Sequence, residues 1–287
     1  MERYDKTKKV GILGVVANLF LLIIKLVVGF ISNSQAMIAD AFNSAGDIFA
    51  SLMTTIGNKL ASVPKDDDHN FGHGKAEYIF SLLISLSMMG ISLKILIESF
   101  FSILENNQLV FSYSLCGVCL ITIISKLILY FYTENIYKKI PNILILSSMK
   151  DHRNDCVLTT CTLFSIICSL FGWYFVDGLV GIGISLWIFY TGFTIFVESY
   201  NVLMDISLDN KTKEGIISII NSFTDIQKVG ELYSVPTGYK YIVVLTIYVD
   251  GNMSTLASHE IADCLEKRIV SDIDKIEQVI VHINPTV

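Results

Sequence analysis

Charged residues are scarce in this chain of 287 residues. Lys, Arg, Asp and Glu make up 17% of the sequence, against about 25% in ordinary soluble domains, while hydrophobic residues make up 52%. This composition excludes an intrinsically disordered chain, which is rich in charge and poor in large apolar side chains. The net charge of -6 leaves no basic surface for a phosphate backbone, which argues against a nucleic-acid-binding protein.

Proline and paired cysteine motifs are also rare. The chain has 4 prolines and 18 glycines, which argues against a linker-rich array of small domains. Its 6 cysteines lie mostly in apolar stretches, where a thiol behaves as a small hydrophobic side chain, so a disulfide-stapled secreted domain is excluded. Cys116 and Cys119 have the spacing of half a zinc site, but no second pair accompanies them, and we interpret them as packing residues.

Long apolar stretches are abundant instead. Six are long enough to cross a hydrocarbon core of about 30 Å, which takes about 20 helical residues. They cover residues 10–31, 36–60, 78–103, 110–133, 144–171 and 177–199. Residues 206–287, by contrast, hold seven Lys and Arg and eleven Asp and Glu, a density typical of a water-exposed domain. We therefore predict a polytopic α-helical membrane protein with six transmembrane helices in residues 1–205 and a cytosolic α+β domain in residues 206–287.

The distribution of Lys and Arg predicts the orientation in the membrane. The N-terminal segment and the connections after the second and fourth stretches are basic, whereas the other three connections contain no Lys or Arg. Because basic loops stay in the cytoplasm, both termini are predicted to be cytoplasmic in a multi-pass protein of the cell membrane. The first stretch lacks a small-residue cleavage site, so we do not expect a cleaved signal peptide.

Two of the stretches carry acidic residues that lipid disfavours. The second contains Asp40, Asn43 and Asp47, and the fifth contains Asp151 and Asp155. A charge at mid-bilayer costs about 2.5–3.5 kcal/mol on insertion scales, so such residues are functional candidates. Asn43 and Asp47 are four residues apart, as are Asp151 and Asp155, so each pair shares a helix face. Asp47 lies about eleven residues, or roughly 16 Å, into its helix, a depth at which the two pairs can meet.

Three carboxylates and an amide oxygen in one place require a compensating cation or protons. Oxygen ligands suit hard divalent cations such as Mn²⁺ or Mg²⁺, whereas zinc sites usually include His or Cys. The alternative is that the aspartates share protons, or pair with intramembrane lysines, and only hold the helices together. His152 is turned about 100° from the face of the pair, so we leave it out of the site. Whether His152 or Asp40 joins the site stays open.

The apolar stretches also contain Lys25, Lys94, Lys126 and Glu98. Lys94 and Glu98 are four residues apart and of opposite charge. For all four we favour snorkelling to the membrane surface or a buried ion pair over a direct role in function.

The connection after the second stretch is rich in possible metal ligands. It reads Asp66-Asp-Asp-His-Asn-Phe-Gly-His-Gly-Lys-Ala-Glu77, in which Asp66, His69 and His73 have ligand-like spacing. Gly72 and Gly74 flank His73 and let the backbone turn tightly around it. From the residues alone, a metal site and a solvated acidic loop are equally good interpretations.

The C-terminal domain has the pattern of a small mixed fold. We predict helices over 211–223 and 255–270 and strands over 228–235, 240–249 and 276–284. The order αββαβ in about 80 residues predicts helices on one face of a sheet. An exposed face in so small a unit is a natural dimer contact.

Together these motifs resemble those of the cation diffusion facilitator family, which are divalent-metal/proton antiporters. The resemblance rests on Asn43-xxx-Asp47, on the stretch Phe71-Gly-His-Gly-Lys-Ala-Glu77 and on Asp151-xxx-Asp155, and it covers nearly the whole chain. It implies six spans with cytoplasmic ends and a ferredoxin-like cytosolic domain that forms a homodimer. It also implies a transporter that is not an enzyme and has no cofactor.

The resemblance implies a role for the residues within the membrane. Asn43, Asp47, Asp151 and Asp155 match the four transport-site ligands of the family. Zinc-transporting members typically have His where Asp151 stands. The Asn-Asp-Asp-Asp set is therefore similar to the manganese-exporting branch, in agreement with the preference of oxygen ligands for hard cations.

The resemblance also implies roles for residues outside the spans. Asp66, His69 and His73 match a loop metal site of some members. Lys75 and Asp205 match positions that form a charge interlock near the dimer interface.

The cytosolic metal site of zinc-transporting members looks degraded in this chain. The matching positions are Glu231, Thr246, His282 and Asn284, with one histidine retained and His259 nearby. We expect this domain to dimerise, and metal sensing by it is in doubt.

These features predict proton-coupled efflux of a divalent metal cation, Mn²⁺ in the first place, by alternating access. A Zn²⁺ or Fe²⁺ exporter of the same family is the alternative, and a passive Mg²⁺ or Mn²⁺ channel would use the same oxygens. An intramembrane hydrolase would also place paired aspartates at mid-membrane, but no substrate-cleavage constellation accompanies them. The expected partners are a second copy of the chain, divalent metal ions, protons and the lipid bilayer.

Overall fold

The computed structural model describes residues 2–31, 35–105, 113–169, 171–173 and 175–286, and leaves out the side chains of 35–43 and of several other helical positions. The chain divides into two compact units. The first comprises Met1–Ser62 and Ala76–Tyr200, and the second comprises Val63–Lys75 and Asn201–Val287. The connection 63–75 therefore folds with the C-terminal residues, although it lies between two long helices in the sequence.

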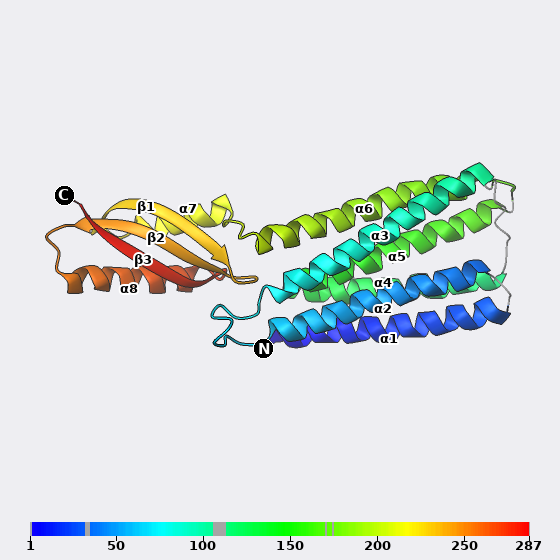
Figure 1. Ribbon diagram of the computed structural model, residues 1–287, viewed down its shortest axis with the longest axis horizontal. Helices are drawn as coiled ribbons and strands as arrows, with labels where there is room; N and C mark the ends of the chain where they lie inside the picture. The colour runs from blue at the N-terminus through cyan, green and yellow to red at the C-terminus, as the bar shows by residue number, and fades with distance from the viewer. Residues whose placement is uncertain (1, 32–34, 106–112, 170, 174, 287) are drawn as a thin grey trace. The chain divides into compact units, whose positions relative to one another are not determined.

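The first unit is a bundle of long helices that lie side by side (Figure 1). They are α1 (Glu2–Ile31), α2 (Gln35–Ala61), α3 (Ala76–Glu105), α4 (Tyr113–Lys139), α5 (Ile143–Ser169) and α6 (Phe175–Leu203). All 4 prolines of the chain lie outside these helices, so no missing backbone N–H interrupts them. In the bundle α1 packs along α2, α4 packs along α5, and α3 contacts both α2 and α5.

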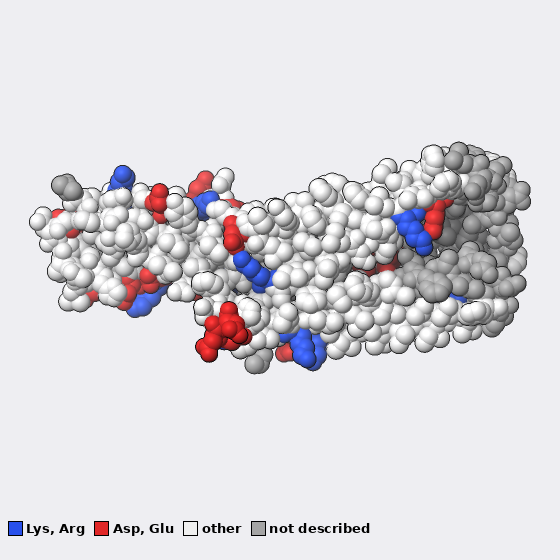
Figure 2. All heavy atoms as spheres, viewed as in Figure 1, with Lys and Arg blue, Asp and Glu red and all other residues white. Residues whose placement is uncertain are grey.

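The outward-facing side chains of the bundle are largely apolar. Phe20, Phe100, Phe131 and Tyr190 are all more than half exposed, and charged side chains are sparse on the helical surface in Figure 2. An apolar exterior of this extent is unusual for a protein in water and is typical of a membrane-embedded one. By length and composition, four of the described helices are able to cross a membrane, namely α1, α3, α4 and α6.

The other two long helices, α2 and α5, are 27 residues each, which is long enough to span a bilayer. They are not among the four most apolar helices of the described residues, and they are the two that carry the intramembrane Asp residues expected to form the site. Four helices are thus long and apolar enough to cross a membrane, and six spans stay a prediction.

The second unit is built on a three-stranded sheet with two helices. Its elements are α7 (Asn210–Ile220), β1 (Ile226–Pro236), β2 (Tyr241–Asp250), α8 (Thr255–Asp272) and β3 (Ile276–Thr286). The strand order is β1-β2-β3, with β1 antiparallel and β3 parallel to β2 (Figure 1). The expected element order αββαβ is confirmed, whereas a complete ferredoxin-like fold stays a prediction.

Buried and less buried residues alternate along β2, and the buried ones form part of the core of the second unit. Leu245 and Ile247 are fully buried together with Ile216 of α7 and with Leu265 and Ile269 of α8, in one cluster. Because residues two apart on a strand share a face, both helices cover the same face of the sheet. The helices therefore lie on one side of the sheet, as the sequence pattern predicted.

The connection 63–75 is docked on the turn between β1 and β2. A Cβ atom added to Gly74 would lie 2.4 Å from the carbonyl oxygen of Thr237, and one added to Gly238, which has a φ of 142°, would lie 2.9 Å from the carbonyl carbon of Gly74. Thr237 in turn donates a hydrogen bond to Glu277 at 2.9 Å, and Lys65 forms an ion pair with Glu277 at 3.4 Å. Two glycines thus allow the loop backbone and the turn backbone to meet.

We expect Gly74→Ala to detach this loop. The added methyl group would collide with a backbone oxygen that no rotamer change can move, at a cost of about 1–3 kcal/mol. Amide hydrogen exchange of residues 63–75 in the full chain should accelerate accordingly. The control is Gly215→Ala, whose Cβ would meet only the Ile273 side chain at 4.0 Å and should leave exchange of the loop unchanged. Equal exchange in both variants would show that the close approach does not hold the loop.

Candidate metal centre

Carboxylates from two helices meet inside the bundle. A cavity there is lined by Asp47 of α2 and by Asp151 and Asp155 of α5, which lie one helical turn apart. The remaining wall comes from α3, α5 and α6, namely Met88, Ile91, Ile95, Asn154, Leu158 and Ile188. Asp47 is 7% exposed, and five of the six other lining side chains are apolar. The three expected aspartates are therefore brought together.

The fourth expected ligand, Asn43, lies on the same face of α2 as Asp47, one turn earlier. Its side chain lies outside the described residues, as does that of Asp40. Membership of either in the site accordingly stays a prediction.

A lysine bridges two of the carboxylates. The Nζ atom of Lys126, on α4, donates hydrogen bonds to Oδ2 of Asp47 at 2.7 Å and to Oδ2 of Asp155 at 2.5 Å. The Lys126 side chain is 1% exposed, so this is a buried, charge-assisted ion pair shared by three helices. The sequence analysis named pairing of the aspartates with intramembrane lysines as the alternative to a metal site, and the contacts of Lys126 with Asp47 and Asp155 are such a pairing.

The other intramembrane cations have different surroundings. Lys94 and Glu98 form an ion pair at 3.6 Å in which both side chains are about two-thirds exposed. Lys25 is buried and donates a hydrogen bond to Ser44 at 3.0 Å. Lys126 thus has two of the site carboxylates as hydrogen-bond partners, whereas Lys94 pairs with an acid on its own helix.

His152 lies closer to the carboxylates than helix geometry suggested. One ring nitrogen of His152 and one oxygen each from Asp151 and Asp155 lie within 4.8 Å of one another. The ring is buried, and its Nδ1 atom has no hydrogen-bond partner in the described part of the chain. His152 therefore offers a nitrogen donor near the two carboxylates, because a side chain reaches around the helix further than its Cα direction implies, and its membership of the site stays open.

A second buried charge network lies at the start of α3. Glu77 accepts a hydrogen bond from Nη2 of Arg3 on α1 at 2.6 Å and another from Asn142, just before α5, at 3.0 Å. Asn142 also caps α5, since its side-chain oxygen accepts from the backbone N–H of Leu144 at 2.7 Å. This network joins three helices, and the sequence analysis assigned no role to Arg3 or Asn142.

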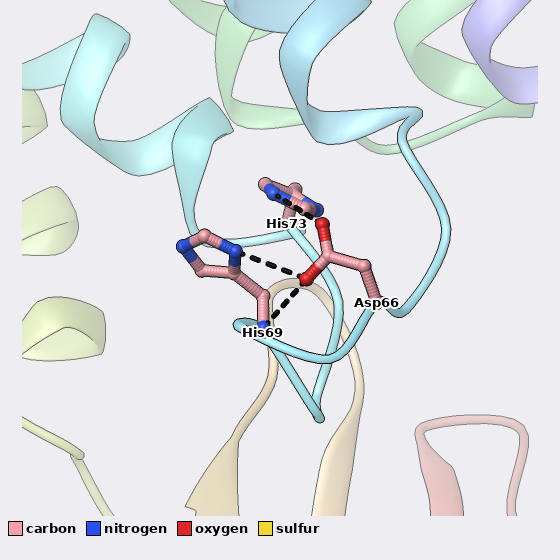
Figure 3. A group of neighbouring side chains, drawn as sticks. All are labelled: Asp66, His69 and His73. Atoms are coloured by element: carbon pink, nitrogen blue, oxygen red, sulfur yellow. Dashed lines mark hydrogen bonds and ion pairs between the residues drawn. The ribbon is translucent and has the colours of Figure 1, made fainter.

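The loop residues Asp66, His69 and His73 form a compact group (Figure 3). Oδ1 of Asp66 accepts from the backbone N–H of His69 at 2.6 Å, and Oδ2 lies 3.6 Å from Nε2 of His73. The two imidazole rings have centroids 4.2 Å apart. The hydrogen bond from the His69 backbone lowers the pKa of Asp66, so its carboxylate is fully ionised and able to bind a cation.

Lys75 and Asp205 form an ion pair at 2.6 Å within the second unit. Asp205 directly follows the last turn of α6 at a φ of 56°, a left-handed conformation that Asp tolerates better than most residues. The pair therefore fastens one end of the 63–75 connection to the segment after α6.

The sheet of the second unit shows few metal-ligating side chains. Thr246 and His282 are direct neighbours on β2 and β3, while His259 lies on α8, exposed, 3.6 Å from Asp263. In the described ranges, groups of three or more His, Cys, Asp and Glu with converging ligand atoms occur at the cavity and in the loop.

Comparison with protein families agrees with this arrangement. The model of the cation efflux transmembrane domain matches residues 11–204. The chain belongs to the cation efflux family. The model of the cytoplasmic domain of cation efflux proteins, a domain type named for dimerisation, matches residues 208–286. Members of this family are transporters of metal cations, and the C-terminal domain of this chain is of the dimer type.

Individual relatives match along their whole length. The manganese efflux system proteins MneP and MneS of Bacillus subtilis (strain 168) are 27% and 30% identical to this chain, and each alignment covers at least 98% of both proteins. The cation-efflux pump FieF of Salmonella paratyphi A is 25% identical over 92% of this chain and 88% of its own length. Metal cation efflux is therefore the common activity named for these relatives.

Among solved structures, the metal-bound C-terminal domain of the CzcD transporter from Thermotoga maritima is similar to a part of this chain. The match covers 27% of this chain and 94% of that domain, with 25% identity and a TM-score of 0.26.

Proposed function

We propose that this protein exports Mn²⁺ from the cytoplasm in exchange for protons by alternating access. The observation that carries this proposal is the convergence of Asp47, Asp151 and Asp155 on one cavity inside an apolar bundle. Carboxylate oxygens are preferred ligands of hard divalent cations, and a dry surrounding strengthens their attraction for a cation.

Carboxylates without a compensating positive charge are costly in this surrounding, and this cost explains why metal and protons would exchange. In an apolar bundle, a divalent cation or protons must neutralise them. A cation arriving from one side displaces protons, and protons arriving from the other side release the cation. Each ligand stabilises a different conformation of the bundle, which is the thermodynamic requirement for coupled transport.

The proposed organisation of the chain follows the same scheme. Residues 1–205 form the transport domain with six spans, in which α2 and α5 bring the ligands, and residues 206–287 form a ferredoxin-like dimerisation domain. Basic connections predict cytoplasmic termini in the cell membrane. We propose that two copies associate through the second unit, with the Lys75–Asp205 ion pair as the interlock near that interface.

The loop group is proposed as a second cation site. Asp66, His69 and His73 offer one carboxylate and two imidazoles within 4.8 Å of one another, a ligand set that also accepts zinc. Its exposure to solvent and its attachment to the second unit suit a cation that arrives from the cytoplasm.

A Zn²⁺ or Fe²⁺ exporter is the second candidate, and one specific observation favours it. His152 adds a nitrogen donor within reach of Asp151 and Asp155, and nitrogen ligands raise the affinity for Fe²⁺ and Zn²⁺. One of the relatives, FieF, is named as a general cation-efflux pump.

Asp47→Ala should abolish Mn²⁺ efflux from metal-loaded vesicles, because it removes the carboxylate that α2 contributes to the cavity. Folding and dimerisation, measured by size-exclusion chromatography, should be retained. Glu98→Ala is the matched control, since Glu98 is also an acid in an apolar helix but is exposed and lies away from the cavity. Wild-type efflux by Asp47→Ala would refute the proposed site.

Proton coupling should appear as a dependence of the Mn²⁺ flux on an imposed pH gradient. In vesicles with the pump reconstituted, an inward-directed proton gradient should drive Mn²⁺ against its own concentration gradient, and dissipating the gradient with a protonophore should stop this uphill movement. A channel would only let Mn²⁺ run down its gradient in both conditions. Uphill flux separates the two mechanisms.

Asp151→His should shift the metal preference toward Zn²⁺. An imidazole in place of a carboxylate oxygen favours zinc over manganese, and a change of about tenfold in the ratio of transport efficiencies corresponds to about 1.4 kcal/mol. Asp151→Asn keeps an oxygen donor and should not produce this shift toward zinc. The readout is competition between Mn²⁺ and Zn²⁺ for efflux, and equal ratios in the two variants would exclude ligand type as the basis of selectivity.

A further inference from the structure

Lys126 lies behind the carboxylates rather than in the cavity. Its Nζ atom contacts Oδ2 of Asp47 and Oδ2 of Asp155, yet Lys126 is not among the residues that line the cavity in the described part of the bundle. Each carboxylate has a second oxygen, so both can bind a metal while they keep the lysine. The ammonium group and a cation in the cavity are therefore able to occupy the centre together.

The net formal charge beside the cavity follows from the carboxylates and the lysine. Among the described groups that line the cavity or contact its carboxylates, Asp47, Asp151 and Asp155 contribute three negative charges when ionised and Lys126 contributes one positive charge, so these four groups carry a net charge of minus two. Outside this group, the buried Lys25 also acts electrostatically on Asp155. A divalent cation brings the sum over the four groups to zero. A monovalent cation leaves one negative charge uncompensated and a trivalent cation leaves one positive charge in excess, and in an apolar surrounding either excess is costly.

We propose that Lys126 is a specificity-determining residue that sets the net charge of the transport site and so selects divalent cations by their charge. This inference rests on the proposed function of the same site. Ligand type then discriminates among divalent metals, and Lys126 discriminates between charges. The ammonium group also holds the carboxylates of Asp47 and Asp155 together, although their like charges repel each other.

The test measures the ratio of Tb³⁺ to Mn²⁺ affinity on the purified full-length protein in detergent, with Tb³⁺ as a luminescent probe and Mn²⁺ as its competitor. Binding that survives in Asp47→Ala comes from other acidic groups and is subtracted. In Lys126→Met the net charge becomes minus three, so this ratio should rise about tenfold or more, which corresponds to at least about 1.4 kcal/mol.

Two compensating variants separate charge from structure. Adding Asp151→Asn to Lys126→Met restores a net charge of minus two and should return the ratio toward the wild-type value. Lys126→Arg keeps the charge and should also keep the ratio. Lys94→Met removes an exposed intramembrane charge away from the cavity and serves as the matched control, with wild-type binding expected.

A Lys126→Met protein that binds both ions more weakly at an unchanged ratio would show a purely structural lysine and overturn the inference. Tighter Mn²⁺ binding at an unchanged ratio would mean that the lysine merely competes with metal, and would overturn it too. If Lys126→Met does not fold, Lys126→Gln is measured instead and is expected to show the same rise. A wild-type protein on which Mn²⁺ fails to displace Tb³⁺ would refute the proposed function itself.

Discussion

The bundle must hold several acidic side chains where no water stabilises them, and this constraint governs its construction. Removing a carboxylate from water costs more than most packing contacts return, so each buried acid needs a partner. Lys126 supplies that partner for two of them at once, from a helix that contributes no carboxylate. This shared ion pair therefore links α2, α4 and α5 beside the cavity.

The same rule applies elsewhere in the bundle. Glu77 is almost fully buried and is satisfied by Arg3 and Asn142, which come from different parts of the chain. The exposed pair Lys94 and Glu98, by contrast, is held loosely at 3.6 Å. Within the bundle, these buried charges thus join helices that are distant in sequence, whereas the exposed pair Lys94–Glu98 lies within one helix. The first kind fixes the geometry of the bundle, and the second contributes little to it.

The sequence allowed the aspartates to be located because a spacing of four residues places two side chains on one helix face. It did not allow their partner to be located, because periodicity states which face of a helix is polar and not which helix lies opposite. Lys126 is 79 residues from Asp47 and 29 residues from Asp155, a separation that only the folded bundle closes. The docking of Gly74 on Thr237 was beyond reach for the same reason, since it joins backbone atoms of two loops. The strands and helices of the second unit were predictable because alternation along β2 is a local property.

The attachment of residues 63–75 to the second unit has a mechanical consequence. A domain joined by one linker turns freely about that linker, but here the chain passes between the two units after Ser62, before Ala76 and after Tyr200. Two of these crossings lead directly into α2 and α3, and α2 is the helix that carries Asp47. The second unit is therefore tied to the helical bundle by three covalent connections, which restrict its rotation more than a single linker does.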